Sequence, residues 1–231
     1  MHRISNYVYA RDELLGMEIP TKRLPNPYRD FPYMVLEGVL SPAECRAITE
    51  SALADRDGVA AELRGKSLDT AIRKTDIHTL TPGHRAVYEA CFAAVRTEIE
   101  QFFALSLGGG TDVQVLGYGP GSFYVRHSDD SSELRDSEGN TIGFRAVAPE
   151  RKLTTVLFTT SYTPHPTDTD HFSGGELLFN YLCDESGNTI TLRPEAGDMV
   201  VFLSNPYFSH EVLPVKEGFR LSLVQWHDAH F

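Results

Sequence analysis

Three side chains that can bind a metal, followed by one arginine, are the residues of this 231-residue chain best suited to chemistry. His127 and Asp129 stand two positions apart, His210 follows far downstream, and Arg220 comes ten residues after it. Two neutral imidazoles and a carboxylate on one face of an iron(II) ion leave three coordination positions open for reaction. A guanidinium in the same pocket can bind a carboxylate through two parallel charge-assisted hydrogen bonds. The pattern predicts an oxygenase that consumes a dicarboxylate cosubstrate, with 2-oxoglutarate as the candidate.

The sequence around these residues predicts strands that would bring them together. The ligand pair follows a glycine-containing turn and a β-prone segment, in which positions two apart project to the same side. His127 and Asp129 can therefore reach one ion. Arg220, Ser222 and Trp226 also share strand parity, so we expect them to line one wall of the same pocket.

Short β-prone runs separated by turn residues dominate the chain from residue 113 onward. We expect strands at residues 113–118, 122–127, 153–161, 176–181, 189–192, 199–203, 211–215 and 219–226. About eight short strands with turns between them are typical of a jelly roll. The predicted fold class is mainly β, a double-stranded β-helix (jelly roll) flanked by N-terminal helices.

Two helices are predicted before the strands. Ser41-Pro42-Ala43-Glu44 is a capping box with proline at the first helical position, and it begins a helix that we expect to end at about Ala54. Thr81-Pro82 begins a longer helix. Its apolar stripe consists of Val87, Cys91, Val95, Ile99 and Phe102. We expect both helices to support the sheet from outside.

Length and charge predict a single domain with no nucleic-acid or membrane partner. A chain of 231 residues can bury one sizeable core. We divide this domain, residues 1–231, into an N-terminal extension (1–30), a strand with supporting helices (31–110) and a jelly-roll core (111–228). The net charge of −11 repels phosphate backbones and anionic lipids. The oligomeric state stays open.

The N-terminus and the cysteines predict a cytoplasmic location. The first 17 residues carry charges and contain no uninterrupted apolar run, so we expect neither a signal peptide nor a transmembrane helix. No Cys-x-x-Cys pair occurs among Cys45, Cys91 and Cys183, and their number is odd, which argues against a disulfide framework. A reducing compartment would suit an enzyme that rests with iron(II).

Taken together, these segments resemble the prolyl 4-hydroxylase branch of the iron(II)/2-oxoglutarate oxygenases, over most of residues 31 to 228. The shared motifs are Tyr118-x-x-Gly121-x-x-Tyr124-x-x-His127-x-Asp129, Arg151-x-x-Thr154, Gly174-Gly175-Glu176-Leu177, Pro194-x-x-Gly197-Asp198 and the run from His210 to Trp226. The resemblance implies Fe(II) as the metal and 2-oxoglutarate and O2 as cosubstrates. It implies hydroxylation of an unactivated carbon, with release of succinate and CO2.

The resemblance also implies roles for single residues. It makes iron ligands of His127, Asp129 and His210. Arg220 would bind the distal carboxylate of 2-oxoglutarate, and Tyr118 and Thr154 match positions beside that cosubstrate. Phe158 departs from the oxygen-sensing relatives, in which a tyrosine assists the distal carboxylate. That duty would fall to Ser222 or Thr154.

For the substrate, the resemblance points to positions but not to a compound. Tyr124, Arg151 and Trp226 match positions near the substrate in relatives. We expect a hydroxylase of an amino acid, free proline being one candidate, or of an amino-acid residue in a larger molecule. The alternatives are an oxygen-sensing or regulatory protein hydroxylase and a non-catalytic metal-binding jelly-roll module. The complete set of ligands with its arginine makes the last reading the least favoured.

Two polar segments and one histidine remain. Residues 128–152 carry charges of both signs and directly follow His127, so both a solvated loop and a lid stay open. Residues 162–171 are rich in Pro, Thr and Asp, which is typical of turns, and we expect no second metal site there. His227 precedes Asp228 at the end of the last strand, and we expect a surface pair.

Overall fold

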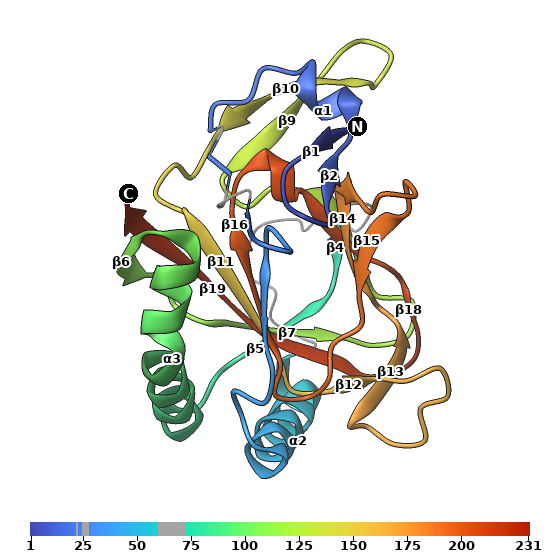
Figure 1. Cartoon of the computed structure of the whole chain (residues 1–231). Helices are drawn as coiled ribbons and strands as arrows, with labels where there is room; N and C mark the ends of the chain where they lie inside the picture. The colour runs from blue at the N-terminus through green and yellow to red at the C-terminus, as the bar shows by residue number, and fades with distance from the viewer. Residues whose placement is uncertain (22, 25–27, 60–72) are drawn as a thin grey trace.

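Two antiparallel sheets form the body of the molecule (Figure 1), and the computed structural model describes residues 1–231 except 22, 25–27 and 60–72. The larger assembly, called the major sheet here, has the strand order β3-β16-β11-β19-β7-β5, and β6 pairs with β19. Its strands are β3 (Met34–Leu36), β5 (Asp76–His78), β6 (Ser106–Gly110), β7 (Gln114–Tyr118), β11 (Leu153–Phe158), β16 (Met199–Leu203) and β19 (Arg220–His230). Every residue of β11 and β16 is buried, as expected for apolar runs in the middle of a covered sheet.

The second assembly, called the minor sheet here, has the order β1-β2-β14-β17-β8-β4, and β15 pairs with β14. Its strands are β1 (His2–Arg3), β2 (Tyr9–Ala10), β4 (Arg73–Lys74), β8 (Phe123–His127), β14 (Leu177–Cys183), β15 (Thr189–Leu192) and β17 (His210–Val212). The two curled sheets enclose a shared apolar core and, between their inner faces, a cavity. This is the jelly-roll arrangement that the strand pattern predicted.

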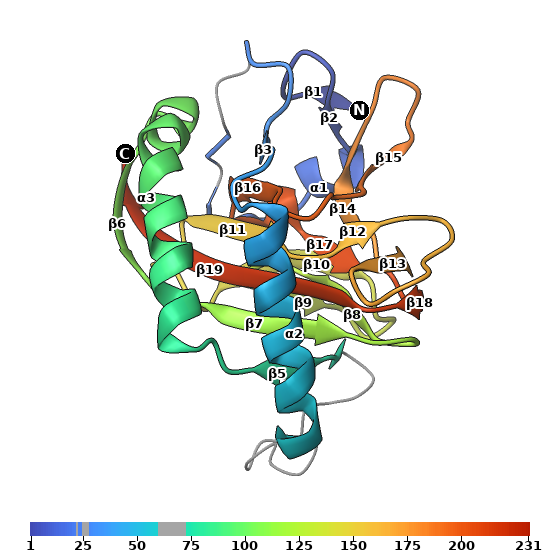
Figure 2. The same ribbon diagram turned by 90° about the horizontal axis from the view of Figure 1, so that it is seen from below.

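Two long helices cover the outer face of the major sheet (Figure 2), and a short α1 (Asp12–Leu15) lies near the N-terminus. The capping box of Ser41 and Glu44 forms as predicted, with a hydrogen bond in each direction, but α2 (Pro42–Val59) extends past the predicted end at Ala54. In α3 (Pro82–Phe103), the N-cap hydroxyl of Thr81 accepts from the backbone of His84. None of the described helices combines the length and apolar character needed to cross a bilayer.

The structure corrects the predicted organisation in two places. Residues 128–152 are not an open loop, because they hold a hairpin of β9 (Ser131–Arg135) and β10 (Thr141–Ala146). The guanidinium of Arg126, on β8, donates to both carboxylate oxygens of Glu133 and to Thr141, and these bonds tie both strands of the hairpin to β8. The strand predicted at 211–215 is divided between β17 and β18 (Val215–Gly218).

A small three-stranded sheet completes the fold. Its order is β12-β13-β18, with β12 at Ser161–Tyr162 and β13 at His171–Gly174. A short 3-10 helix, η1 (Pro206–Phe208), leads into β17. Its N-cap Asn205 accepts a hydrogen bond from the backbone of Tyr207, which fixes the approach of the chain to that strand.

His227 does not form the expected surface pair, because α3 covers this part of β19. Its side chain is 2% exposed, its ring stacks on Phe92 with centroids 4.7 Å apart, and its Nε2 lies 3.0 Å from the hydroxyl oxygen of Thr155. Burial, with a smaller contribution from Arg96, lowers the pKa of His227 to about 4. The neutral imidazole is therefore part of the core.

We expect His227 to make folding stability depend on acidity. The pKa in the folded state lies below the ordinary value of 6.5, so the unfolded chain takes up the proton first. Stability present above about pH 6.5 is then lost as the pH falls toward about 4, and the loss at pH 5 is about 2 kcal/mol. Urea unfolding of the wild type and of His227→Gln at about pH 7.5 and about pH 5 measures this. Equal losses of stability in the two proteins would contradict it.

Candidate active site

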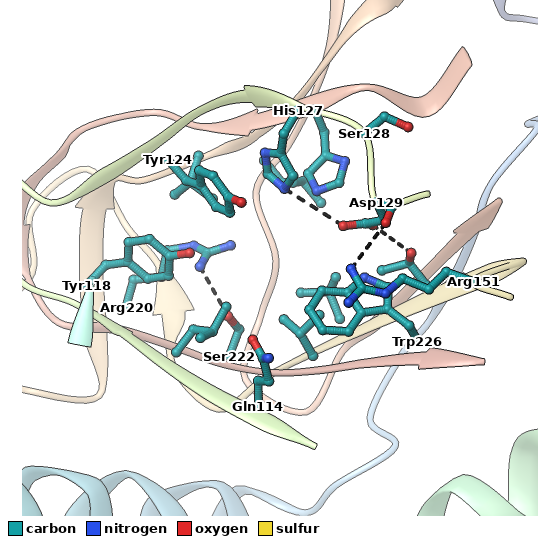
Figure 3. Close-up of a pocket in the computed structure, with 17 residues that line it drawn as sticks. Gln114, Tyr118, Tyr124, His127, Ser128, Asp129, Arg151, Arg220, Ser222 and Trp226 are labelled. Atoms are coloured by element: carbon teal, nitrogen blue, oxygen red, sulfur yellow. Dashed lines mark hydrogen bonds and ion pairs between the residues drawn. The ribbon is translucent and has the colours of Figure 1, made fainter. Parts of the chain in front are cut away.

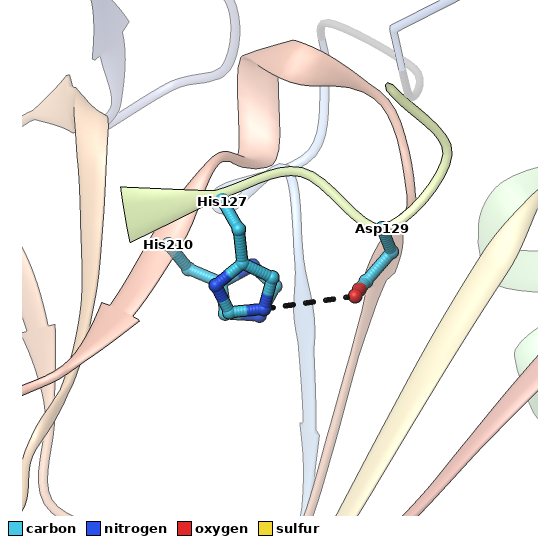
Figure 4. Close-up of side chains that lie close together, drawn as sticks. All are labelled: His127, Asp129 and His210. Atoms are coloured by element: carbon cyan, nitrogen blue, oxygen red, sulfur yellow. Dashed lines mark ion pairs between the residues drawn. The ribbon is translucent and has the colours of Figure 1, made fainter. Parts of the chain in front are cut away.

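Pairing of β17 with β8 places His210 directly opposite His127, with ring centroids 4.3 Å apart. Asp129 follows β8 by two residues, and its carboxylate turns toward the two rings (Figure 4). The Nε2 of His127 lies 3.8 Å from Oδ1 of Asp129. One ligand atom from each of the three residues lies within 4.8 Å of the others. In the part of the chain that the structure describes, this is the one such group of His, Cys, Asp or Glu.

Backbone carbonyls fix the orientation of both imidazoles. Nδ1 of His127 lies 2.9 Å from the carbonyl oxygen of Val125, and Nδ1 of His210 lies 2.9 Å from that of Phe208. Because a carbonyl oxygen can only accept, each Nδ1 carries a hydrogen. In the neutral imidazole this leaves the lone pair on Nε2, the form that binds a metal.

The carboxylate of Asp129 receives a hydrogen bond from a hydroxyl group across the cavity. Its side chain is buried, with 4% exposed. The hydroxyl of Thr154, on β11, donates to Oδ2 of Asp129 at 2.6 Å. A predicted contact of Thr154 with the cosubstrate thus stays a prediction, whereas the structure shows its hydrogen bond to this carboxylate.

Arg220 is a buried cation at the other end of the cavity. Its side chain is 1% exposed and lies over the rings of Tyr118 and Phe158, at 4.8 and 4.9 Å from their centroids. One guanidinium nitrogen donates to Ser222 at 3.2 Å, and Nε has no hydrogen-bond partner. Burial lowers the pKa of Arg220 to about 10, against an opposing effect of Tyr118, so the group remains charged at neutral pH.

The surroundings of Arg220 would favour a bound anion. No carboxylate of the described residues forms an ion pair with Arg220. A buried charge without a counter-ion is unfavourable by several kcal/mol. The free Nε and the planar guanidinium offer the paired donors that a carboxylate accepts. The residues present therefore fit the distal carboxylate of a dicarboxylate such as 2-oxoglutarate.

The cavity between these groups has a volume of about 230 Å³ and is lined from both sheets (Figure 3). Its lining includes all ten predicted site residues: Tyr118, Tyr124, His127, Asp129, Arg151, Thr154, His210, Arg220, Ser222 and Trp226. The expected parity of Arg220, Ser222 and Trp226 is thus confirmed. Gln114 is the polar lining residue on β7 that the sequence analysis missed, although it shares strand parity with Tyr118.

Arg151 and Trp226 form the wall on the opposite side from Arg220. The guanidinium carbon of Arg151 lies 4.0 Å from the centroid of the indole, and one nitrogen donates to the carbonyl oxygen of Asp129 at 3.2 Å. Nε of Arg151 and Nε1 of Trp226 are buried without a hydrogen-bond partner. This wall therefore holds two N–H groups that make no hydrogen bond within the described part of the chain.

Tyr124 packs directly against one of the metal-binding candidates. Its ring stacks on the imidazole of His127, with centroids 3.7 Å apart and an interplanar angle of 14°. The loop at residues 162–171 lies outside this cavity. There His171 and Asp168 pair with each other at 2.6 Å, and Asp170 pairs with Arg46, as in an ordinary polar turn.

Comparison with known proteins agrees with this geometry. A Pseudomonas putida prolyl-4-hydroxylase is 26% identical, covers 86% of this chain and 93% of its own, and has a TM-score of 0.58. A viral collagen prolyl hydroxylase from Paramecium bursaria Chlorella virus-1, solved as its 2-oxoglutarate complex, is 20% identical, with 86% and 96% coverage and a TM-score of 0.56. A Trichoplax adhaerens prolyl hydroxylase, in complex with a peptide of hypoxia inducible factor, is 18% identical, with 85% and 83% coverage and a TM-score of 0.59. No curated protein sequence matches the chain at a significant level.

A family model of the 2OG-Fe(II) oxygenase superfamily matches residues 113–228, half of the chain. The chain belongs to this superfamily and is a 2-oxoglutarate-dependent dioxygenase. Within the superfamily it falls in the prolyl 4-hydroxylase-like branch. The family implies Fe(II) and 2-oxoglutarate, and the His127, Asp129 and His210 group and the buried Arg220 fit them.

We expect the three clustered residues to bind one divalent ion. Replacing partners outside the ligand set typically weakens metal binding by about 10- to 100-fold, so loss of a ligand should exceed that. Mn(II), titrated into metal-free protein and followed by the EPR signal of the free ion, tests His127→Ala, Asp129→Ala and His210→Ala. His171→Ala is the matched control, because His171 pairs with Asp168 outside the cavity. Affinity equal to the wild type in any of the three would remove that residue from the site.

Proposed function

We propose that the chain hydroxylates an unactivated carbon of an amino-acid residue, with a prolyl residue of a peptide as the first candidate. His127, Asp129 and His210 would hold Fe(II), and the products would include succinate and CO2. The observation that carries the proposal is the two-ended cavity. A metal-binding group lies between one buried guanidinium, which has no carboxylate partner among the described residues, and a second wall with two N–H groups that make no hydrogen bond there.

At one end, Arg220 binds the distal carboxylate of 2-oxoglutarate. Ser222 is the hydroxyl that assists, because it already contacts the guanidinium, whereas the hydroxyl of Thr154 is engaged by Asp129. Phe158 stands where the oxygen-sensing relatives carry a tyrosine, and it supplies only an aromatic face beneath the Arg220 guanidinium. Tyr118 supplies the second face and also lines the cavity beside the cosubstrate.

Bound Fe(II) and 2-oxoglutarate, together with O2, supply the oxidising power for the hydroxylation of a C–H bond. The chain supplies ligands, orientation and exclusion of water. The backbone carbonyls of Val125 and Phe208 keep both imidazoles in the metal-binding tautomer. Apolar side chains complete the lining between the two ends, namely Leu116, Val156, Leu177, Val212 and Val224.

At the other end, Trp226 and Arg151 line the cavity, with the guanidinium of Arg151 stacked over the indole. The indole supplies apolar surface for an aliphatic ring, and the N–H groups of the two side chains suit a carbonyl oxygen. A volume of about 230 Å³ is below the roughly 300–1,000 Å³ of common ligand pockets. It suits a small cosubstrate plus one side chain, so the rest of a peptide would lie across the mouth. The peptide complex of the Trichoplax adhaerens enzyme and the collagen hydroxylase support a peptidyl substrate.

The substrate class is tested with purified enzyme, Fe(II), 2-oxoglutarate and O2. Proline-containing peptides, the same peptides with alanine in place of proline, and free proline are compared by succinate release and by a mass gain of one oxygen atom. We expect coupled hydroxylation of a proline-containing peptide that is lost with alanine and lost in His210→Ala. Coupled hydroxylation of free amino acids alone would contradict the peptidyl substrate. No succinate with any substrate would contradict the activity.

A second test uses variants of Arg220. It distinguishes a residue that binds the cosubstrate from a cation with only a structural role. Removing one partner of a buried, hydrogen-bonded charge pair costs about 2 to 5 kcal/mol. Arg220→Ala should therefore weaken 2-oxoglutarate binding by roughly 30-fold or more. Arg220→Lys should fall between, since an ammonium keeps the charge but loses the planar fork.

Anaerobic titration of 2-oxoglutarate into the iron(II) enzyme, followed by metal-to-ligand charge-transfer absorbance, measures this affinity. The affinity for Mn(II) should stay the same in both variants, because Arg220 lies away from the ligand group. An unchanged dissociation constant for 2-oxoglutarate in Arg220→Ala would rule out the proposed contact.

A further inference from the structure

Asp129 is connected to a chain of buried hydroxyl groups that neither the comparisons nor the proposed chemistry uses. Thr154 is 1% exposed and Ser204 is 2% exposed. The hydroxyl oxygen of Thr154 lies 2.6 Å from Oδ2 of Asp129 and 2.9 Å from the hydroxyl oxygen of Ser204. The backbone carbonyl of Ser204 accepts from the hydroxyl of Ser128 and from the backbone N–H of Asp130, so Ser204 is itself tied to the segment that carries Asp129.

The chemistry of these groups fixes the direction of the hydrogen bonds. An ionised carboxylate only accepts, so the single hydroxyl hydrogen of Thr154 points to Oδ2 of Asp129. The oxygen of Thr154 must then accept from the hydroxyl of Ser204. The chain runs from Ser204 through Thr154 to Asp129, and hydrogen bonds arranged in series strengthen one another.

The two carboxylate oxygens of Asp129 therefore have different neighbours. Oδ2 is occupied by the hydroxyl of Thr154, whereas Oδ1 lies 3.8 Å from Nε2 of His127, on the side of the ligand group. We propose that Thr154 is a positioning residue that presents Asp129 to the metal through Oδ1 alone, with Ser204 fixing Thr154. A carboxylate bound through one oxygen leaves free the coordination position that a second oxygen would take. This inference rests on the proposed function, because it assumes that Asp129 is a metal ligand.

The neighbouring residue on β11 provides a matched control. Thr155 is also fully buried, but alternate residues of a strand face opposite sides, and its hydroxyl contacts His227 on the side covered by α3. Thr154→Val and Thr155→Val therefore remove the same group from adjacent positions of one strand. Only the first removes a donor to Asp129.

The experiment compares Mn(II) dissociation constants of Thr154→Val, Thr154→Ser, Ser204→Ala and Thr155→Val, each checked by thermal unfolding without metal. We expect Thr154→Val to weaken Mn(II) by about 10- to 100-fold, the usual effect of losing a partner of a ligand. Thr154→Ser should restore binding, Ser204→Ala should give a smaller loss, and Thr155→Val should match the wild type. With Mn(II) saturating, the affinity of Thr154→Val for 2-oxoglutarate should be unchanged, which separates positioning of Asp129 from contact with the cosubstrate.

Several results would overturn the inference. They are wild-type Mn(II) affinity in Thr154→Val, an equal loss in Thr155→Val, or a loss confined to 2-oxoglutarate affinity. If Thr154→Val does not fold, Ser204→Ala decides, and unchanged Mn(II) affinity there overturns it. If the wild type still hydroxylates a substrate with release of succinate, any of these results overturns only the inference about Thr154 and not the proposed function. A wild type that binds no divalent metal would overturn both.

Discussion

The pairing of β8 with β17 is the constraint on which the rest of the site depends. It sets His127 opposite His210, and both donors of the metal-binding tautomer are satisfied by carbonyls of the same two chain segments. A slip of one residue would turn the side chains of one strand to the other face of the sheet. The register is held by the turn η1 and by the buried ring of Phe208, which packs on Phe179 and Phe202. The placement of the two histidines and the packing of the core are therefore specified by the same contacts.

A second constraint is the buried charge of Arg220, which the chain keeps without a carboxylate among the described residues. The rings of Tyr118 and Phe158 compensate part of the lost hydration through cation–π contacts. Gly175 makes room for it, since a Cβ there would come within 3.1 Å of Cδ of Arg220, and its φ of +64° suits glycine. Gly175 thus shapes the end of the cavity that holds Arg220. A bound dicarboxylate that meets this charge would also stabilise the fold, because it binds only the folded state.

Much of the site followed from the sequence because strand parity is a local rule. Residues spaced by two on a predicted strand share a wall, and this placed Arg220, Ser222 and Trp226 correctly. Features that depend on contacts with a distant helix or strand could not be predicted from the sequence. The burial of His227 requires α3 to lie over β19. The hairpin at residues 131–146 looks like a mixed-charge loop in the sequence, and the contact of its Glu133 with Arg126 joins it to another strand, β8. The hydroxyl of Thr154 gives no sign in the sequence of whether it faces the cosubstrate or Asp129.

The two sheets contribute differently to the site, and Asp129 lies where their contributions meet. Both histidines stand on paired strands of the minor sheet, so the ladder between β8 and β17 positions them. Arg220, Ser222 and Trp226 stand on β19 of the major sheet. Asp129 comes after the last residue of β8 and belongs to no strand, so no ladder holds its side chain. Its orientation must come from side chains across the cavity, and the hydroxyl of Thr154 on β11 is the group that reaches its carboxylate. In the proposed role of Asp129 as a metal ligand, the site would be sensitive to the spacing between the two sheets, because any shift of β11 relative to β8 moves the hydroxyl that donates to this carboxylate.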